Sequence, residues 1–175
     1  MESLKIICMS VTAAIIYGIV LDQITARICV EYFTIGHPPI FGTDDPTLLG
    51  LGWGIVATWW AGLLVGIPLA IAARGGSRPK RSSASLIRPI IKLLIGMAIC
   101  AGTTGILGWF LARQGAVFLT GPIADEVPVD RHVAILADLW VHLASYACGF
   151  LGGILLFVTV WRSRRLAMVE FIDHF

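Results

Sequence analysis

The polar residues with the most chemical potential are Asp138 and His142, which lie four positions apart in an otherwise apolar segment. Residues four apart project from one face of a helix, so this carboxylate and imidazole can act on the same atom. Such a pair is typical of a metal site with oxygen and nitrogen ligands. An Asp that only orients a His by a hydrogen bond has the same spacing, and the pair alone leaves both interpretations open.

A second group of polar residues lies in the connection VEYFTIGHPPIFGTDDP, which spans residues 30–46 between two apolar segments. It contains Glu31 and His37, and the prolines after His37 turn the chain back over the helix ends. At about 1.5 Å of rise per residue, Asp22 and Arg113 reach the same level as the pair in the last segment. The sequence therefore predicts that these polar residues meet near one end of a helix bundle.

The hypothesis from this convergence is a divalent metal site, with zinc as the metal that suits the ligands best. Asp22 and Glu31 are its candidate catalytic residues, with Asp22 as a base or as a residue that orients a ligand. A metal with a vacant position could activate water for hydrolysis. The predicted metal ligands are Glu31, His37, Asp138 and His142.

Simpler roles exist for the acids of this connection. If the first helix continues to residue 33, Arg27 and Glu31 form an ion pair at i,i+4 on its surface. Asp44 and Asp45 precede Pro46, where acids at a helix N-terminus are favoured by the helix dipole. Each polar residue could also be a satisfied hydrogen-bond partner between helices, in which case no metal binds.

The elements that must position these residues are transmembrane helices. The mean hydropathy of +0.85 is too high for a water-soluble domain, and only 14% of the 175 residues are charged. Four apolar segments approach the roughly 20 residues that cross a bilayer as a helix, and their lack of alternation excludes a β-barrel. We predict an all-α, polytopic four-transmembrane-helix bundle. It forms a single membrane domain over 1–175, with helices at about 4–33, 47–73, 88–113 and 132–162.

Glycines at helix-packing spacing indicate how such helices associate. Small side chains three or four apart let two backbones approach closely, which favours helix pairing inside a membrane. The predicted packing pairs are Gly50 and Gly54, Gly62 and Gly66, Gly102 and Gly105, and Gly149 and Gly153.

The charge distribution predicts the orientation. The connection from Arg74 to Lys92 and the segment after Trp161 are basic, whereas the other two connections carry acids. By the positive-inside rule, the basic connection and both termini are cytoplasmic, and the polar residues described above lie on the periplasmic side. A basic face of this kind is a topology signal, so we expect no nucleic-acid partner.

The segment DQITARICVEYFTIGHP, from Asp22 to Pro38, carries a resemblance. It is similar to a family of bacterial four-helix integral membrane proteins to which no function is attached. The similarity extends to about Gly76, and EYFTIGHP is its most distinctive part. The resemblance implies a location in the bacterial inner membrane and supplies no activity, substrate or ligand.

Two classes of function follow. The first is a metal-dependent hydrolase that acts at the membrane surface on a lipid, an acyl chain or a peptide bond. The second is a non-enzymatic binding or assembly subunit that packs a partner through glycine-rich helix faces. Membrane lipids are the expected partners in both, and a homo-oligomer or a partner membrane subunit stays open. The sequence lacks the GxSxG, CxxC and HExxH motifs of other catalytic classes.

Overall fold

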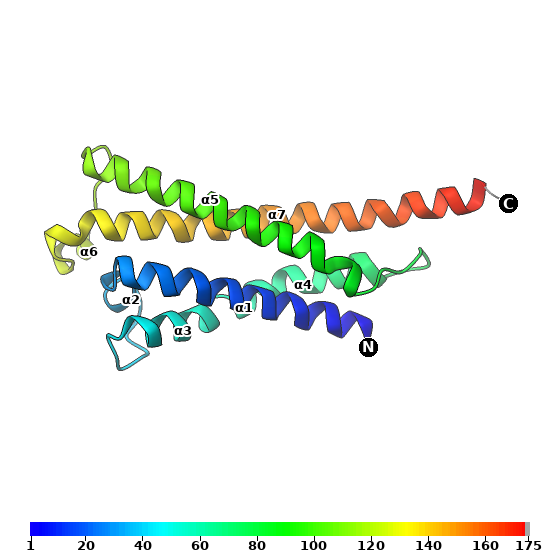
Figure 1. The fold of residues 1–175 in the computed structure, drawn as a ribbon, viewed down its shortest axis with the longest axis horizontal. Helices are drawn as coiled ribbons and strands as arrows, with labels where there is room; N and C mark the ends of the chain where they lie inside the picture. Colours follow the sequence, from blue (N-terminus) through cyan, green and yellow to red (C-terminus); the bar gives the residue numbers. More distant parts are fainter. Residues whose placement is uncertain (174–175) are drawn as a thin grey trace.

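The structure, a computed structural model, describes the backbone of residues 1–173 and the side chains of residues 1–165. Within these residues all regular secondary structure is helical, with no strand (Figure 1). His174 lies outside the described part. The long helices are α1 (Glu2–Ile28), α3 (Pro46–Val56), α4 (Trp59–Arg74), α5 (Ile87–Arg113) and α7 (His132–Asp173). The short ones are α2 (Glu31–Thr34), η1 (Ala84–Leu86), α6 (Pro122–Glu126) and η2 (Val129–Arg131).

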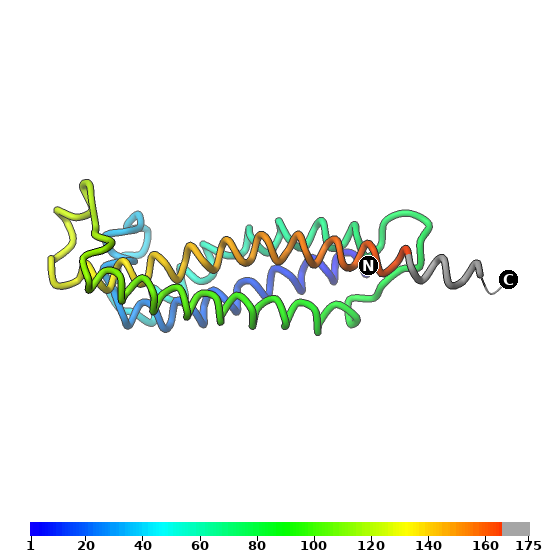
Figure 2. Tube along the Cα trace, turned by 90° about the horizontal axis from the view of Figure 1, so that it is seen from above, coloured from blue at the N-terminus to red at the C-terminus, as the bar shows by residue number. Residues whose placement is uncertain are grey.

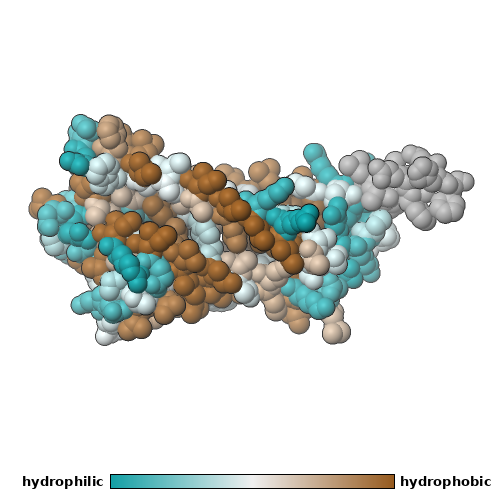
Figure 3. Space-filling model, in the orientation of Figure 1, coloured by the Kyte–Doolittle hydropathy of each residue, from teal (hydrophilic) through white to brown (hydrophobic). Residues whose placement is uncertain are grey.

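In the described part of the chain, four helical stretches are long and apolar enough to span a membrane, which confirms the predicted fold class. They are Glu2–Ile28, Pro46–Arg74, Ala84–Arg113 and Val129–Arg165. Their outward side chains form an apolar band between two polar ends, as Figure 3 shows on one face. Exposure of large apolar side chains is expected where lipid replaces water as the solvent.

The bundle consists of two closely packed helix pairs. In the first pair, α1 packs against α3 and α4, which together form one span. In the second pair, α5 packs against α7. The two pairs meet where α4 contacts α7. The loops gather at the two ends of an elongated molecule (Figure 2). The N-terminus lies at the same end as the basic loop between α4 and α5, opposite α2 and α6 (Figure 1). This arrangement places the candidate site residues at the end away from the basic loop.

Glycines make the close contacts within both pairs. A Cβ on Gly54 would lie 2.5 Å from the Ile19 Cα of α1, and one on Gly62 would lie 2.6 Å from the Val11 Cα. Between α5 and α7, a Cβ on Gly105 would lie 2.4 Å from Val141. Gly102 differs from the prediction, because no atom lies within 4 Å of its added Cβ.

The first helix ends earlier than predicted. α1 stops at Ile28, where the backbone of Cys29 is extended, and Glu31 begins the separate helix α2. The predicted pair of Arg27 and Glu31 is therefore wrong. Arg27 instead donates to the carbonyl and the side chain of Gln23 and to Thr47 Oγ1. Leaving the axis of α1 lets α2 fold across the bundle mouth.

The second predicted helix is interrupted. Asp45 caps α3 by accepting hydrogen bonds from the amides of Thr47 and Leu48, both at 2.9 Å, as its position before Pro46 predicted. The helix then breaks at Ala57 and Thr58, and α4 starts at Trp59. The break therefore precedes the proline in α4 by about three turns, and the helix continues through that proline.

Candidate functional site

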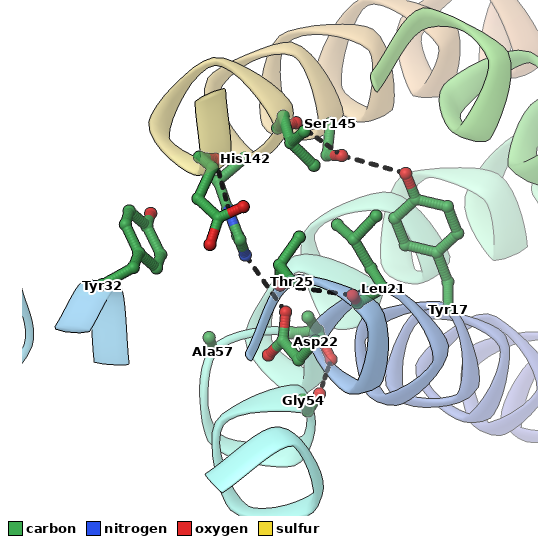
Figure 4. A network of polar contacts seen from close by, with 12 residues as sticks. Tyr17, Leu21, Asp22, Thr25, Tyr32, Gly54, Ala57, His142 and Ser145 are labelled. Carbon is green, nitrogen blue, oxygen red and sulfur yellow. Dashed lines mark hydrogen bonds and ion pairs between the residues drawn. The ribbon is translucent and has the colours of Figure 1, made fainter. Parts of the chain in front are cut away.

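Asp22 and His142 form a buried pair between the two halves of the bundle. His142 Nε2 lies 3.1 Å from Asp22 Oδ1, and the two residues are 9% and 4% exposed (Figure 4). Asp22 comes from the last part of α1, and His142 from the third turn of α7. The predicted convergence of these residues is confirmed. The two residues are 120 positions apart in the sequence, and their contact connects one helix pair to the other.

The second ring nitrogen of His142 determines how protons are placed. Nδ1 lies 2.7 Å from the backbone carbonyl oxygen of Asp138, which can only accept, so Nδ1 carries a proton. Nε2 then either accepts a proton from a neutral Asp22 carboxyl or donates one to the ionised carboxylate. In both cases one proton lies on the axis between the two side chains, and the pair can donate and accept hydrogen bonds.

Asp138 lies one turn from His142, but its side chain does not join the pair. The residue is 1% exposed, and among the described residues neither carboxylate oxygen has a hydrogen-bond partner. A buried polar group without a partner is costly. The backbone of Asp138, and not its carboxylate, is what orients His142.

Aromatic rings enclose the outer side of the pair. Tyr32 of α2 stacks on the His142 ring with a centroid distance of 4.5 Å and an interplanar angle of 22°. The Tyr32 ring also lies 4.9 Å from the His37 ring, measured between centroids. His37 Nδ1 donates to the carbonyl of Tyr32 at 2.8 Å, and its ring lies 4.5 Å from that of Trp53. The loop prediction that brings His37 over the bundle mouth agrees with this packing.

Two further polar contacts connect α7 with the other helix pair. The Tyr17 hydroxyl of α1 lies 2.9 Å from Ser145 Oγ, a contact that Figure 4 displays. The Tyr146 hydroxyl donates at 3.0 Å to the carbonyl of Ala57, at the break between α3 and α4. A hydroxyl from α7 therefore satisfies a backbone group that the helix break frees.

A cavity of about 290 Å³ runs from the Asp22–His142 pair along the interface of the two helix pairs. Most of its lining is apolar, with small residues such as Ala14 and Gly62 in the middle and larger ones such as Leu94 towards the other end. Exposed residues of α4 and α7 also line it, so it reaches the surface where lipid would lie. These are Trp60, Leu64, Tyr146 and Phe150.

Glu31 has a structural partner outside the pair. Its Oε2 accepts a hydrogen bond from Arg131 Nε at 3.0 Å and one from Cys29 Sγ at 3.4 Å. Burial acts to raise the pKa of Glu31, but hydrogen bonds from its own backbone amide, Arg131 and Cys29 outweigh it and lower the pKa. Arg131 also donates to the Ile28 carbonyl at 2.9 Å, so this ion pair fastens the end of α1 and α2 to the start of α7.

The four predicted metal ligands are not brought together as a coordination group. In the described part of the chain, no set of three or more His, Cys, Asp or Glu residues could hold a metal ion. Glu31 is bound to Arg131, His37 to the Tyr32 carbonyl, and His142 to Asp22. The sequence predicted that these residues lie near the same end of the bundle, but it could not predict the direction of each side chain. Arg113 also stays apart, with its guanidinium 4.9 Å over the Trp109 ring.

Sequence reasoning missed the contributions of Tyr17 and Tyr32. Tyr17 carried a signal, because a tyrosine inside an apolar span needs a partner for its hydroxyl. Tyr32 carried none, since its position over His142 depends on the end of α1 at Ile28. Asp138 and His142 project from one helix face, as their spacing predicts, and this face, which also carries Ser145, is buried in the bundle interior.

Comparison with protein-family models, with curated proteins and with solved structures found no match to this chain.

Proposed function

We propose that this protein is an integral membrane protein that binds a single-chain lipid with an uncharged polar head. The apolar chain would occupy the cavity between the two helix pairs, and the head would bind to Asp22 and His142. The observation that carries the proposal is the cavity itself, which is apolar along its length and ends at a buried pair able to donate and accept hydrogen bonds. Ligand pockets typically combine an apolar lining with a few convergent polar groups.

The charges of the cavity favour an uncharged head. Among the described residues that line the cavity there is no Lys or Arg, and Asp22 is an acid. In either protonation state the Asp22–His142 pair has no net charge, so a phosphate or a free carboxylate would be desolvated there without a surplus cation to compensate. A hydroxyl or carbonyl head, by contrast, can exchange hydrogen bonds with the one proton that the pair holds.

The size of the cavity favours one chain. Its volume of about 290 Å³ lies just below the roughly 300–1,000 Å³ of small-molecule pockets. The surface opening between Trp60 and Leu64 of α4 and Phe150 of α7 would let a chain enter sideways from the bilayer. A lipid with two acyl chains would leave one of them outside.

For location, we propose a bacterial inner membrane with the termini in the cytoplasm. The proposal rests on the resemblance of the segment around EYFTIGHP and on the positive-inside rule applied to the basic loop. The polar pair would then lie near the periplasmic side. A metal-dependent hydrolase is less well supported, because such a site needs about three protein ligands on one ion.

The test is to identify the lipids that copurify with the protein. Wild type is extracted in mild detergent, and bound lipids are quantified by mass spectrometry per mole of protein. The variant Ala61→Phe fills the cavity from α4, and Ala98→Phe adds the same ring on the exposed face of α5. We expect about one uncharged single-chain lipid per wild-type molecule, loss of that lipid in Ala61→Phe, and retention in Ala98→Phe.

Two results would overturn the proposal. One is equal recovery of the lipid from wild type and from a folded Ala61→Phe protein. The other is that the lipids retained are phospholipids alone. Asp22→Asn is a second variant with little change in volume, and it should weaken retention by removing the proton exchange with His142 without filling the cavity.

A further inference from the structure

The second feature that points to a ligand lies at the opposite end of the bundle, around Arg164 of α7. This arginine is 1% exposed, and each of its three guanidinium nitrogens donates to a backbone carbonyl. It donates to Pro79 O at 2.7 Å, to Gly75 O at 2.8 Å, to Arg78 O at 3.0 Å and to Ala72 O. It thereby satisfies carbonyls at the C-terminus of α4 and holds the following loop against α7.

The loop that Arg164 holds positions the side chain of Arg78. The guanidinium carbon of Arg78 lies 4.5 Å from the centre of the Trp161 ring. Trp161 is an exposed residue near the inner end of the transmembrane part of α7. Arg78 Nη1 is buried and has no hydrogen-bond partner among the described residues. A buried cationic donor without an acceptor costs free energy, so this nitrogen is suited to an acceptor from outside the chain.

Among the residues whose side chains the structure describes, those around Arg78 are positive, and none of them is a counterion for it. Arg74 and Arg78 lie close enough to interact electrostatically with Arg164. The chain from Arg74 to Lys92 contains no acid. Among the described side chains at this end of the bundle, the acidic one is that of Glu2. It already binds Lys5 at 3.0 Å and the amide of Ser83 at 2.9 Å. An anion would therefore be attracted here and would not displace an existing ion pair.

We propose that Arg78 binds the phosphodiester of an anionic phospholipid at the inner membrane interface, with the charge of Arg74, which also lies near Arg164, adding to the attraction. A guanidinium matches phosphate oxygens in geometry and remains charged at any physiological pH. The Trp161 ring under Arg78 fits the depth of lipid headgroups, where tryptophans of membrane proteins gather. This site is separate from the cavity and does not depend on the function proposed above.

The experiment measures lipid binding to the full-length protein in mixed micelles of phosphatidylglycerol and phosphatidylcholine, by native mass spectrometry. Wild type should retain phosphatidylglycerol in preference to phosphatidylcholine. Arg78→Gln should weaken phosphatidylglycerol binding about tenfold, the lower range for losing a hydrogen bond to a charged group. The matched control is Arg113→Gln, because Arg113 also covers a tryptophan but lies at the opposite end of the bundle.

A second arm distinguishes a lipid phosphate from a free phosphate. Inorganic phosphate at millimolar concentration should not displace the lipid, since the lipid is also held by its chains. Arg78→Lys keeps the charge and should retain the preference in part, which separates a binding defect from misfolding. An equal effect of Arg78→Gln and Arg113→Gln, no preference for the anionic lipid in wild type, or complete displacement by phosphate would each overturn the assignment.

Discussion

At the scale of single residues, the central observation is an acid and an imidazole that share one proton inside a transmembrane bundle. His142 is oriented by the carbonyl of Asp138, and Asp22 is oriented towards it from α1. Ionisable residues in membrane spans are costly unless they are paired and face the interior, and their presence usually indicates function. Within this bundle the pair both ties the helix pairs together and forms the polar end of the cavity.

The strength of this pair can be measured with a double-mutant cycle. Asp22→Leu and His142→Leu should each destabilise the protein in detergent, because each leaves a buried partner unsatisfied. The double variant should be more stable than the sum of the two losses predicts, with a coupling free energy of about 0.6–1.7 kcal/mol, as for other hydrogen bonds between membrane helices. Additive losses, measured by thermal unfolding, would contradict a direct interaction.

The ion pair of Glu31 and Arg131 predicts a pH dependence. Because the folded pKa of Glu31 lies below its usual 4.5, the pair stabilises the fold above that value, and this stabilisation is lost as the pH falls through the folded pKa. We expect wild type to be more stable than Glu31→Gln at pH 7 by about 0.2–1 kcal/mol, a difference that vanishes in strong acid. Unfolding curves of the two proteins from pH 7 to pH 3 test this, and a constant difference would contradict it.

At the scale of elements, the helices are joined by glycines whose missing side chains make room for a neighbouring backbone. Gly54 of α3 and Gly102 of α5 provide a matched comparison. The first lies against Ile19 of α1, whereas an added Cβ on the second meets no atom within 4 Å. Both are glycines inside a helix, so their intrinsic preferences are alike and only the neighbouring helix differs.

Substitution of these two glycines by alanine should have opposite effects. Gly54→Ala should destabilise the protein by about 1–3 kcal/mol, because the methyl group cannot be accommodated without moving α1. Gly102→Ala should be neutral or stabilise by up to about 1 kcal/mol, the difference in helix propensity. Thermal unfolding in the same detergent decides between these outcomes, and a similar loss for both variants would show that packing is not the cause.

The break between α3 and α4 depends on a hydroxyl from α7. Tyr146→Phe removes the donor to the Ala57 carbonyl and should destabilise the protein by about 0.5–1.5 kcal/mol. The control is Thr159→Val, which also removes a hydroxyl from α7, but one that bonds only its own helix at Leu155. A smaller loss for Tyr146→Phe than for the control would argue against this role for the hydroxyl.

At the scale of the whole molecule, the loops and charges divide between two ends. The basic loop and the N-terminus lie at one end, and α2 and α6 lie at the other, with an apolar band between them. The acids of the connections at the α2 and α6 end include Asp45, Asp125 and Asp130. A membrane-spanning protein that follows the positive-inside rule has this separation of charges.

The orientation can be tested with single cysteine reporters in intact bacterial cells. Ser77→Cys lies in the basic loop and Thr120→Cys in the connection between α5 and α6, and both positions are exposed. A membrane-impermeant thiol reagent should label Thr120→Cys and should label Ser77→Cys only after the cells are broken. Wild type provides the background from its own four cysteines. Labelling of Ser77→Cys from outside would reverse the proposed orientation.

The sequence alone determined the membrane architecture. Hydropathy and length predicted four spans, because only a helix satisfies its backbone within about 20 apolar residues of lipid. The four-residue spacing of Asp138 and His142 also predicted that both side chains project from one helix face. These inferences depend on local composition and helical periodicity, which the chain carries without reference to its neighbours.

Only the tertiary structure decided which polar groups are partners. Helix rise and the position of the connecting loop predicted that Asp22, Glu31, His37 and His142 lie near one end of the bundle. Which residues they contact depends on side-chain direction and on where α1 ends, at Ile28. Because α1 ends there, Glu31 pairs with Arg131, and His142 is the partner of Asp22. The cavity likewise follows from the spacing of two helix pairs. Contacts between residues more than 100 positions apart arise from packing, which no local pattern records.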